Sequence, residues 1–221
     1  MIVLALAQQK GGVGKSTLAI NLATAAMEYR RRPAIIDMDH GQGTVTKWFT
    51  RRQAQGMTEP NVVKADSATI DAVIDSLKSA GYNFILIDLP GKSSPAIGAG
   101  LKPADLVLIP SRPHDVDIEA SLDTVKACLR MGKPYAYIMN ITTPHPTRAA
   151  QVAAVLRKAK HPVATPHIVQ RIAVADAVTA GLGINEAARG SVAAREFDSM
   201  LLWILTHLKG LGHEQALATQ H

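Results

Sequence analysis

Short apolar runs that alternate with longer amphipathic stretches constrain the fold of this 221-residue chain more than any other feature. The runs are brief and flanked by turn residues, as buried parallel strands are. The predicted strands are Ile2–Ala7, Pro33–Ile36, Asn61–Lys64, Phe84–Ile87, Leu106–Ile109 and Tyr135–Met139. The predicted helices that alternate with them are Ser16–Arg31, Thr44–Gln55, Thr69–Ala80, Asp117–Met131 and Thr147–Lys158.

This repeated strand–helix order predicts an α/β fold with a mostly parallel sheet flanked by helices on both faces. A last helix is predicted over 191–208, and we expect it to pack on the sheet through four apolar residues at helical spacing: Phe197, Leu201, Leu205 and Leu208. No linker or repeat indicates a second domain, so we expect one domain over 1–208 and a short polar tail over 209–221. Ligands should bind at the carboxyl ends of the strands.

A glycine-rich turn, K-G-G-V-G-K-S-T, follows the first predicted strand and opens the first helix. In this context backbone N–H groups and the helix N-terminus attract phosphate, which predicts a P-loop NTPase that binds a nucleotide. Lys15 is expected to reach the β- and γ-phosphates, and the Ser16 hydroxyl to ligate Mg²⁺. The predicted nucleotide contacts are Lys10, Gly11, Gly12, Val13, Gly14, Lys15, Ser16 and Thr17.

The run NFILIDLPG places Asp88 after four apolar residues, as in a Walker B strand. Its carboxylate can hold Mg²⁺ through water, because the ion keeps much of its hydration shell. A hydrophobic strand that ends in Asp is common by chance, so this signal depends on the P-loop that accompanies it. Together the two motifs predict a Mg²⁺-dependent nucleotide site.

The glycine-rich turn departs from the general P-loop pattern, which requires glycine where this chain has Gln9. With its additional Lys10 it resembles the deviant Walker A motif of the ParA/MinD superfamily of dimerising ATPases. The resemblance implies that Lys15 serves its own ATP, whereas Lys10 crosses a homodimer interface to the partner's phosphates. Nucleotide binding and dimerisation would then be one event. The alternative for Lys10 is a solvated loop lysine.

The stretch IIDMDHGQGT resembles the first switch of that superfamily, D-x-D-P-Q. The resemblance implies that Asp39 orients the attacking water and that Asp37 supports the Mg²⁺ shell. His40 and Gly41 stand where one proline is usual, so we expect a loop that is one residue longer. The alternative for Asp39 is a cap on the next helix.

Three further positions match the superfamily. Gly91, in the second switch, would offer its amide to the γ-phosphate. Asp117 lies in a stretch, LIPSRPHDVDIEA, where we expect a helix cap or a dimer contact. Asn140 follows the last predicted strand at a position where relatives contact the adenine base, although an asparagine is also an ordinary loop residue.

The resemblance covers nearly the whole chain and is closest to the small ParA type, which has no added N-terminal DNA-binding region. It implies an ATPase switch of plasmid or chromosome partition, cytoplasmic and nucleoid-associated. The switch would bind DNA non-specifically in the ATP state and be stimulated by a small DNA-binding or cargo adaptor protein of ParB/ParG type. Alternatives are the positioning of another cargo, such as a carboxysome, a conjugation or a secretion complex, and a MinD-like membrane ATPase.

The net charge of +6 favours association with polyanions, although diffuse solvated charges give the same total. Among the basic residues, Arg189 and Arg195 lie near the start of the last predicted helix, a region that relatives use for DNA. They are the predicted nucleic-acid contacts.

Other classes are disfavoured. An iron-protein reductase needs two cysteines per subunit, and the chain has only Cys128, for which we expect a buried thiol in a reducing compartment. A ligase of the dethiobiotin synthetase type lacks the lysine at position 10. The terminal stretch GLGHEQALATQH is polar and weakly charged, so no stable membrane binding is expected.

Overall fold

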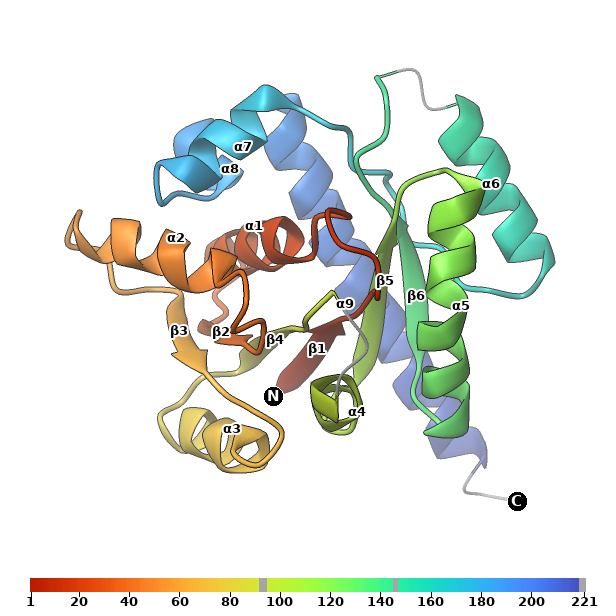
Figure 1. Ribbon diagram of the computed structural model, residues 1–221, viewed down its shortest axis with the longest axis horizontal. Coiled ribbons are helices and arrows are strands. Elements are labelled where there is room, and N and C mark those ends of the chain that lie inside the picture. The colour runs from red at the N-terminus through yellow and green to blue at the C-terminus, as the bar shows by residue number, and fades with distance from the viewer. Residues whose placement is uncertain (92–94, 145–146, 219–221) are drawn as a thin grey trace.

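A computed structural model describes residues 1–91, 95–144 and 147–218. It contains one sheet whose six strands are all parallel, in the order β3-β2-β4-β1-β5-β6, with helices on both faces (Figure 1). The strands are β1 (Ile2–Leu6), β2 (Pro33–Asp37), β3 (Asn61–Lys64), β4 (Phe84–Asp88), β5 (Leu106–Ser111) and β6 (Tyr135–Met139). The predicted fold class and all six predicted strands are confirmed.

The helices are α1 (Lys15–Glu28), α2 (Thr44–Gln53), α3 (Ile70–Ser79), α4 (Pro95–Leu101), α5 (Asp115–Arg130), α6 (Thr147–Lys158), α7 (Ile172–Thr179), α8 (Ile184–Ala187) and α9 (Val192–Ala218). Helices α4, α7 and α8 were not predicted. Two of these are very short, and α4 contains Gly98 and Gly100, which are poor helix formers.

Helix α9 continues to Ala218, past the predicted end at Leu208, so the residues expected to form a tail are helical as far as that point. Leu211 explains part of the extension, because it packs against the core one turn after Leu208 despite the glycines on either side of it. The predicted packing of α9 is confirmed: Phe197 and Leu201 lie in the core, and Leu205 and Leu208 pack on it.

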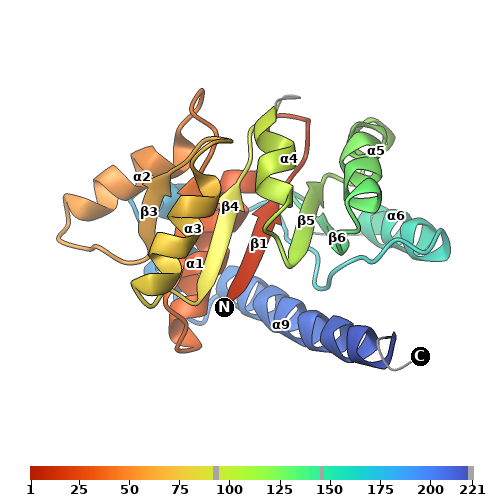
Figure 2. The same cartoon turned by 90° about the horizontal axis from the view of Figure 1, so that it is seen from below.

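The core has two halves, one on each face of the sheet, because successive side chains of a strand point to opposite faces. In β1, Val3 and Ala5 belong to the half that packs against α3, α4, α5 and α6, whereas Leu4 and Leu6 face α1, α2, α7, α8 and α9. Figure 2 shows α9 running along its face of the sheet. The free thiol of Cys128 is buried as predicted, and burial raises its pKa to about 11.

The carboxyl ends of all six strands meet at one edge of the sheet, which places the predicted motifs together. Asp37 and Asp88 are partners in the register of β2 and β4, and Leu6, just before the glycine-rich turn, is the partner of Asp88 in β1. Within the described part of the chain, no helix is both long and apolar enough to cross a membrane.

Candidate nucleotide site

The glycine-rich turn after β1 forms a compact loop around Lys15. The Lys15 side chain is only 8% exposed, and its Nζ donates a hydrogen bond to the carbonyl oxygen of Gln8 at 3.2 Å. Burial lowers the pKa of Lys15, an effect that Asp88 and Asp39 partly offset. Gly12 and Gly14 have φ of 73° and 85°, which lies in the left-handed region where a side chain is strained. The glycines of the motif therefore allow the loop conformation that a P-loop needs.

Two side chains from neighbouring strand ends hold the loop from outside. Arg112 Nη2 donates to the carbonyl oxygen of Gly12 at 2.7 Å, and Asn140 Nδ2 donates to that of Val13 at 2.8 Å. A Cβ at Gly14 would lie 2.4 Å from Asn140 Nδ2, so only glycine fits there. One of the two N–H groups of the Asn140 amide is thus engaged with the loop, so the other N–H and the amide oxygen are the groups left for the predicted adenine contact.

Asp88 and Ser16 form the candidate metal site. Ser16 Oγ donates to Asp88 Oδ2 at 2.6 Å, while Asp88 Oδ1 is buried and has no hydrogen-bond partner among the described residues. Burial, together with the nearby carboxylates of Asp37 and Asp39, raises the pKa of Asp88 to about 7, although the hydrogen bond from Ser16 and the charge of Lys15 act in the opposite direction. A hydroxyl beside an unpaired carboxylate oxygen suits a hard cation such as Mg²⁺. The described residues contain no group of three His, Cys, Asp or Glu that could hold a metal, so phosphate and water would supply the other ligands.

Asp37 organises the first switch. Its Oδ1 accepts the backbone N–H of Asp39 at 3.0 Å, and its Oδ2 accepts the backbone N–H and the hydroxyl of Thr46 at 3.1 and 2.7 Å. Thr46 is in the first turn of α2, so Asp37 provides the helix cap that was the alternative role for Asp39. Both oxygens of Asp37 have partners, one in the loop and one in α2, and its predicted part in the Mg²⁺ shell would be an outer one.

Asp39 lies at the rim of the phosphate cavity. Its Oδ1 accepts the backbone N–H of Gln42 at 3.2 Å, and the residue is partly exposed. Together with the glycine-rich loop, Asp39 lines a cavity of about 260 Å³ that also includes Lys15 and Ser16. The carboxylate is therefore in a place where it could contact a water molecule beside a phosphate.

Lys10 does not line this cavity. Its Nζ lies 2.6 Å from Asp117 Oδ1, an ion pair in which the lysine is 36% exposed and the aspartate 2% exposed. Helix α5 begins at Asp115 with His114 as its N-cap, so the expectation that Asp117 caps the helix is wrong. The helix starts earlier than predicted, and Asp117 holds Lys10 instead.

Gly91 lies directly against the glycine-rich loop. A Cβ built on it would lie 3.3 Å from Lys15 Nζ and 3.4 Å from Gly11 Cα, so the second switch is in close contact with the glycine-rich loop. The predicted amide contact with the γ-phosphate remains a prediction, consistent with this position.

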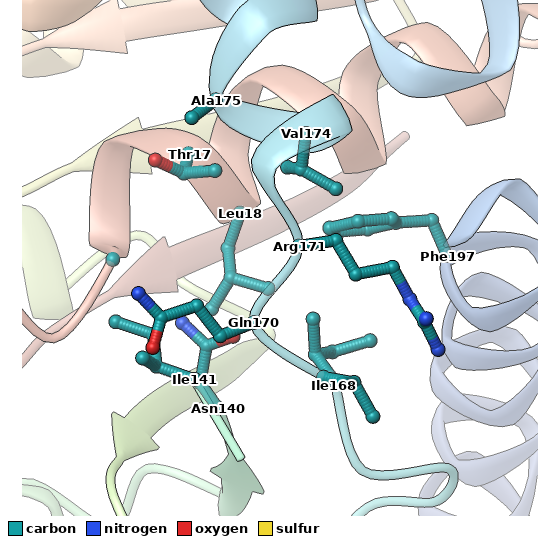
Figure 3. A pocket seen from close by; sticks show the side chains of 12 residues that line it. Thr17, Leu18, Asn140, Ile141, Ile168, Gln170, Arg171, Val174, Ala175 and Phe197 are labelled. Carbon is teal, nitrogen blue, oxygen red and sulfur yellow. The ribbon is translucent and has the colours of Figure 1, made fainter. Parts of the chain in front are cut away.

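A second cavity of about 160 Å³ opens beside Gly14 and Thr17. Figure 3 shows it between the start of α1, the residue pair Asn140 and Ile141, and the segment that leads into α7. Its walls are largely apolar, and Arg171 is tied by its Nη2 to Glu196 Oε1 at 2.6 Å. Gln170 brings a side-chain amide to this cavity. The sequence reasoning missed Gln170 because it lies in an irregular segment with no motif.

Of the two predicted DNA contacts, Arg189 lies just before α9 and Arg195 lies in its first turn. Arg195 Nη1 donates to the carbonyl oxygen of Gly190, and Arg189 Nη2 lies 3.3 Å from Glu28 Oε1. Arg189 remains 80% exposed in spite of this pair. The structure therefore places both arginines at the surface near the start of α9.

Comparison with known proteins agrees with this geometry. Residues 1–160 match the family described as ATPase MipZ. A carboxysome distribution protein A of Halothiobacillus neapolitanus is 28% identical over 207 residues, which cover 90% of this chain and 94% of that protein. The chromosome-partitioning ATPase Soj of Thermus thermophilus is 29% identical over 158 residues, 57% of this chain and 63% of Soj.

Among solved structures, the cell division ATPase MinD of Pyrococcus furiosus superposes with a TM-score of 0.76 at 19% identity, covering 93% of this chain and 98% of MinD. Likeness at that level of identity establishes the fold. The family match extends over most of the chain and includes the glycine-rich loop, both switches, Asp88 and Asn140. The chain therefore belongs to the MipZ family of ATPases, within the ParA/MinD superfamily.

Proposed function

We propose that this protein is a nucleotide-gated switch that positions a cargo on DNA. It binds ATP with Mg²⁺, forms a homodimer around two nucleotides, and binds DNA without sequence preference in that state. Hydrolysis, stimulated by a small DNA-binding or adaptor protein, returns it to the monomer. The observation that carries the proposal is the second lysine, Lys10, which is beside the phosphate cavity without lining it.

Each residue around the cavity has a separate role in binding or hydrolysing the nucleotide. Lys15 and the loop amides bind the β- and γ-phosphates, because oriented N–H groups and a buried ammonium stabilise their negative charge. Ser16 and Asp88 would hold Mg²⁺, which would neutralise charge on the phosphate oxygens. Asp39 orients the attacking water. Because Asp39 is the only carboxylate assigned to orient this water, hydrolysis without a partner protein should be slow.

Dimerisation follows from the geometry of Lys10. The ammonium lies outside the cavity lining, where it is 36% exposed and paired with Asp117. A second copy that presents its own phosphates to this ammonium would give Lys10 a more highly charged partner than one carboxylate. The ATP state would therefore favour the dimer, because the trans contact exists only when the partner carries nucleotide.

The DNA-binding part rests on net charge and on Arg189 and Arg195. A dimer doubles the number of such arginines, and each phosphate neutralised releases counterions. Weak binding by the monomer would thus become much stronger binding by the dimer. No base readout is expected, because no helix-turn-helix or zipper signal is present in the sequence.

The cargo distinguishes two versions of the proposal. Our sequence-based hypothesis is plasmid or chromosome partition, in line with the relative Soj. A relative whose match covers 90% of this chain and 94% of its own length is instead named for the maintenance of carboxysome distribution, which supports the positioning of another cargo as a second candidate.

The test is a salt titration of binding to unrelated DNA duplexes with ATP, with ADP and without nucleotide. We expect tight, strongly salt-dependent binding with ATP only, with equal affinity for each duplex. Equal affinity in the three nucleotide states would contradict gating, and no binding at low salt would contradict the DNA-binding part.

A further inference from the structure

Arg112 and Asn140 hold the phosphate-binding loop from positions outside the lining of its cavity. Their nitrogens donate to the carbonyl oxygens of Gly12 and Val13, two consecutive residues of the loop. Neither side chain lines the phosphate cavity, although the loop glycines do. The two donors therefore hold loop carbonyls without occupying the lining of the cavity.

Because of peptide geometry, these two contacts also determine where the N–H groups of Val13 and Gly14 point. In a trans peptide unit, the C=O group and the N–H group of the following residue point in opposite directions. A donor that holds the Gly12 carbonyl outward thus turns the Val13 N–H inward, and a donor on the Val13 carbonyl does the same for the Gly14 N–H. Because glycine readily adopts several backbone conformations, Gly12 and Gly14 would not fix this orientation themselves.

The Arg112 side chain has a rigid base. Its backbone carbonyl accepts hydrogen bonds from Ser111 Oγ at 3.0 Å and from the backbone N–H of His114 at 2.8 Å. Arg148 Nε, from α6, donates to the next carbonyl, that of Pro113, at 2.7 Å. The segment after β5 is therefore fixed on both sides of Arg112.

The guanidinium of Arg112 is not fully hydrogen-bonded. Its Nε is buried and has no hydrogen-bond partner within the described residues, which carries a free-energy cost. A side chain that accepts this cost while it binds a loop carbonyl through Nη2 is better explained by its effect on the loop than by its own stability.

We propose that Arg112 is a positioning residue of the nucleotide site: it orients the Val13 N–H toward the phosphates, as Asn140 orients the Gly14 N–H. The inference rests on the proposed nucleotide binding and deepens it. Arg112 does not contact the nucleotide itself. Its loss would weaken the binding of phosphates through one peptide unit, and that of Asn140 through the next.

The experiment is an NMR titration of ¹⁵N-labelled protein with Mg–ADP, which avoids the ATP-dependent dimer. In the wild type, the amide signals of Val13 and Gly14 should both shift on binding. In Arg112→Gln the Val13 shift should largely disappear while the Gly14 shift persists, and the Kd for ADP should rise about tenfold. In Asn140→Ala the Gly14 shift should disappear and the Val13 shift should persist.

Two further variants separate positioning from general structure. Arg112→Lys keeps a cationic donor and should recover most of the Val13 shift. Arg130→Gln, at an exposed arginine of α5, should behave as wild type.

Three results would overturn the inference. One is an unchanged Val13 shift and Kd in Arg112→Gln, and another is equal loss of the Val13 and Gly14 shifts in that variant. The third is a failure of the wild type to bind ADP, which would overturn the proposed function as well and is recognised because it appears without any substitution.

Discussion

Lys10, next to the glycines of the phosphate-binding loop, and Asp117, in the first turn of α5, form an ion pair of 2.6 Å within one chain. Asp117 is almost fully buried, so the pair keeps a carboxylate satisfied that would otherwise be costly. If Lys10 contacts the partner's phosphates in a dimer, it has to leave or share this carboxylate. The pair therefore links the state of the lysine in the monomer to its proposed use in the dimer.

Lys10→Ala should lose ATP-dependent dimerisation and keep most of its ATP affinity, because Lys15 and the loop amides remain. It should also lower the free energy of unfolding by about 1–3 kcal/mol, since Asp117 is left buried without its cation. ATP binding is measured by calorimetry and stability by chemical denaturation.

The double variant Lys10→Ala with Asp117→Asn separates these two effects. It should regain much of the stability, because no unpaired charge remains, yet stay monomeric with ATP. A double variant that dimerises like wild type would show that Lys10 matters only through folding.

Asp88→Asn should make stability less dependent on pH in metal-free protein. The folded-state pKa of Asp88 is raised to about 7, so the stability this carboxyl contributes is fully present below the unfolded pKa and is lost as pH rises through about 7. Asparagine cannot ionise and avoids that loss. Relative to wild type, the variant should therefore gain about 2–3 kcal/mol in free energy of unfolding between about pH 5 and about pH 8.

Denaturant titrations across this pH range give the comparison. Asp71→Asn is a suitable control, because Asp71 is 61% exposed and its pairing with Lys102 is solvated. A difference between Asp88→Asn and wild type that does not change with pH would contradict the raised pKa.

Asp39→Ala should bind ATP and dimerise but hydrolyse it far more slowly, because no other described carboxylate at the cavity rim is free to orient water. Both carboxylate oxygens of Asp37 already accept hydrogen bonds, from Asp39 and from Thr46. Phosphate release is the assay, with and without DNA. Hydrolysis at the wild-type rate would show that the first switch is assigned to the wrong residue.

Arg189→Ala and Arg195→Ala should each weaken DNA binding in the ATP state. Each should also reduce the magnitude of the log–log salt slope by about 0.9 for every DNA phosphate that the variant no longer neutralises. Lys158→Ala, on α6 at the other side of the molecule, is the matched control and should leave the slope unchanged (Figure 1). If Lys158→Ala has the larger effect, the DNA-binding surface lies on α6 instead.

Much of this fold was predictable, because hydrophobic strand runs and the order of elements are properties of local sequence. The site could be predicted as far as the motifs reach: Lys15, Ser16 and Asp88 do meet at one edge of the sheet. The cap role predicted for Asp117 was wrong because α5 begins two residues earlier than expected. The contacts of Arg112 and Gln170 could not be predicted, because they depend on how separate loops approach one another in space.

The central claim is that ATP converts the chain from a monomer to a dimer through Lys10. The most direct test is the molar mass by light scattering after size exclusion, for Asp39→Ala with ATP, which should retain its nucleotide. We expect 23.6 kDa without nucleotide or with ADP, about twice that mass with ATP, and 23.6 kDa again when Lys10→Ala is added to the same background. A mass of 23.6 kDa in every state, or a dimer that persists without Lys10, would contradict the account.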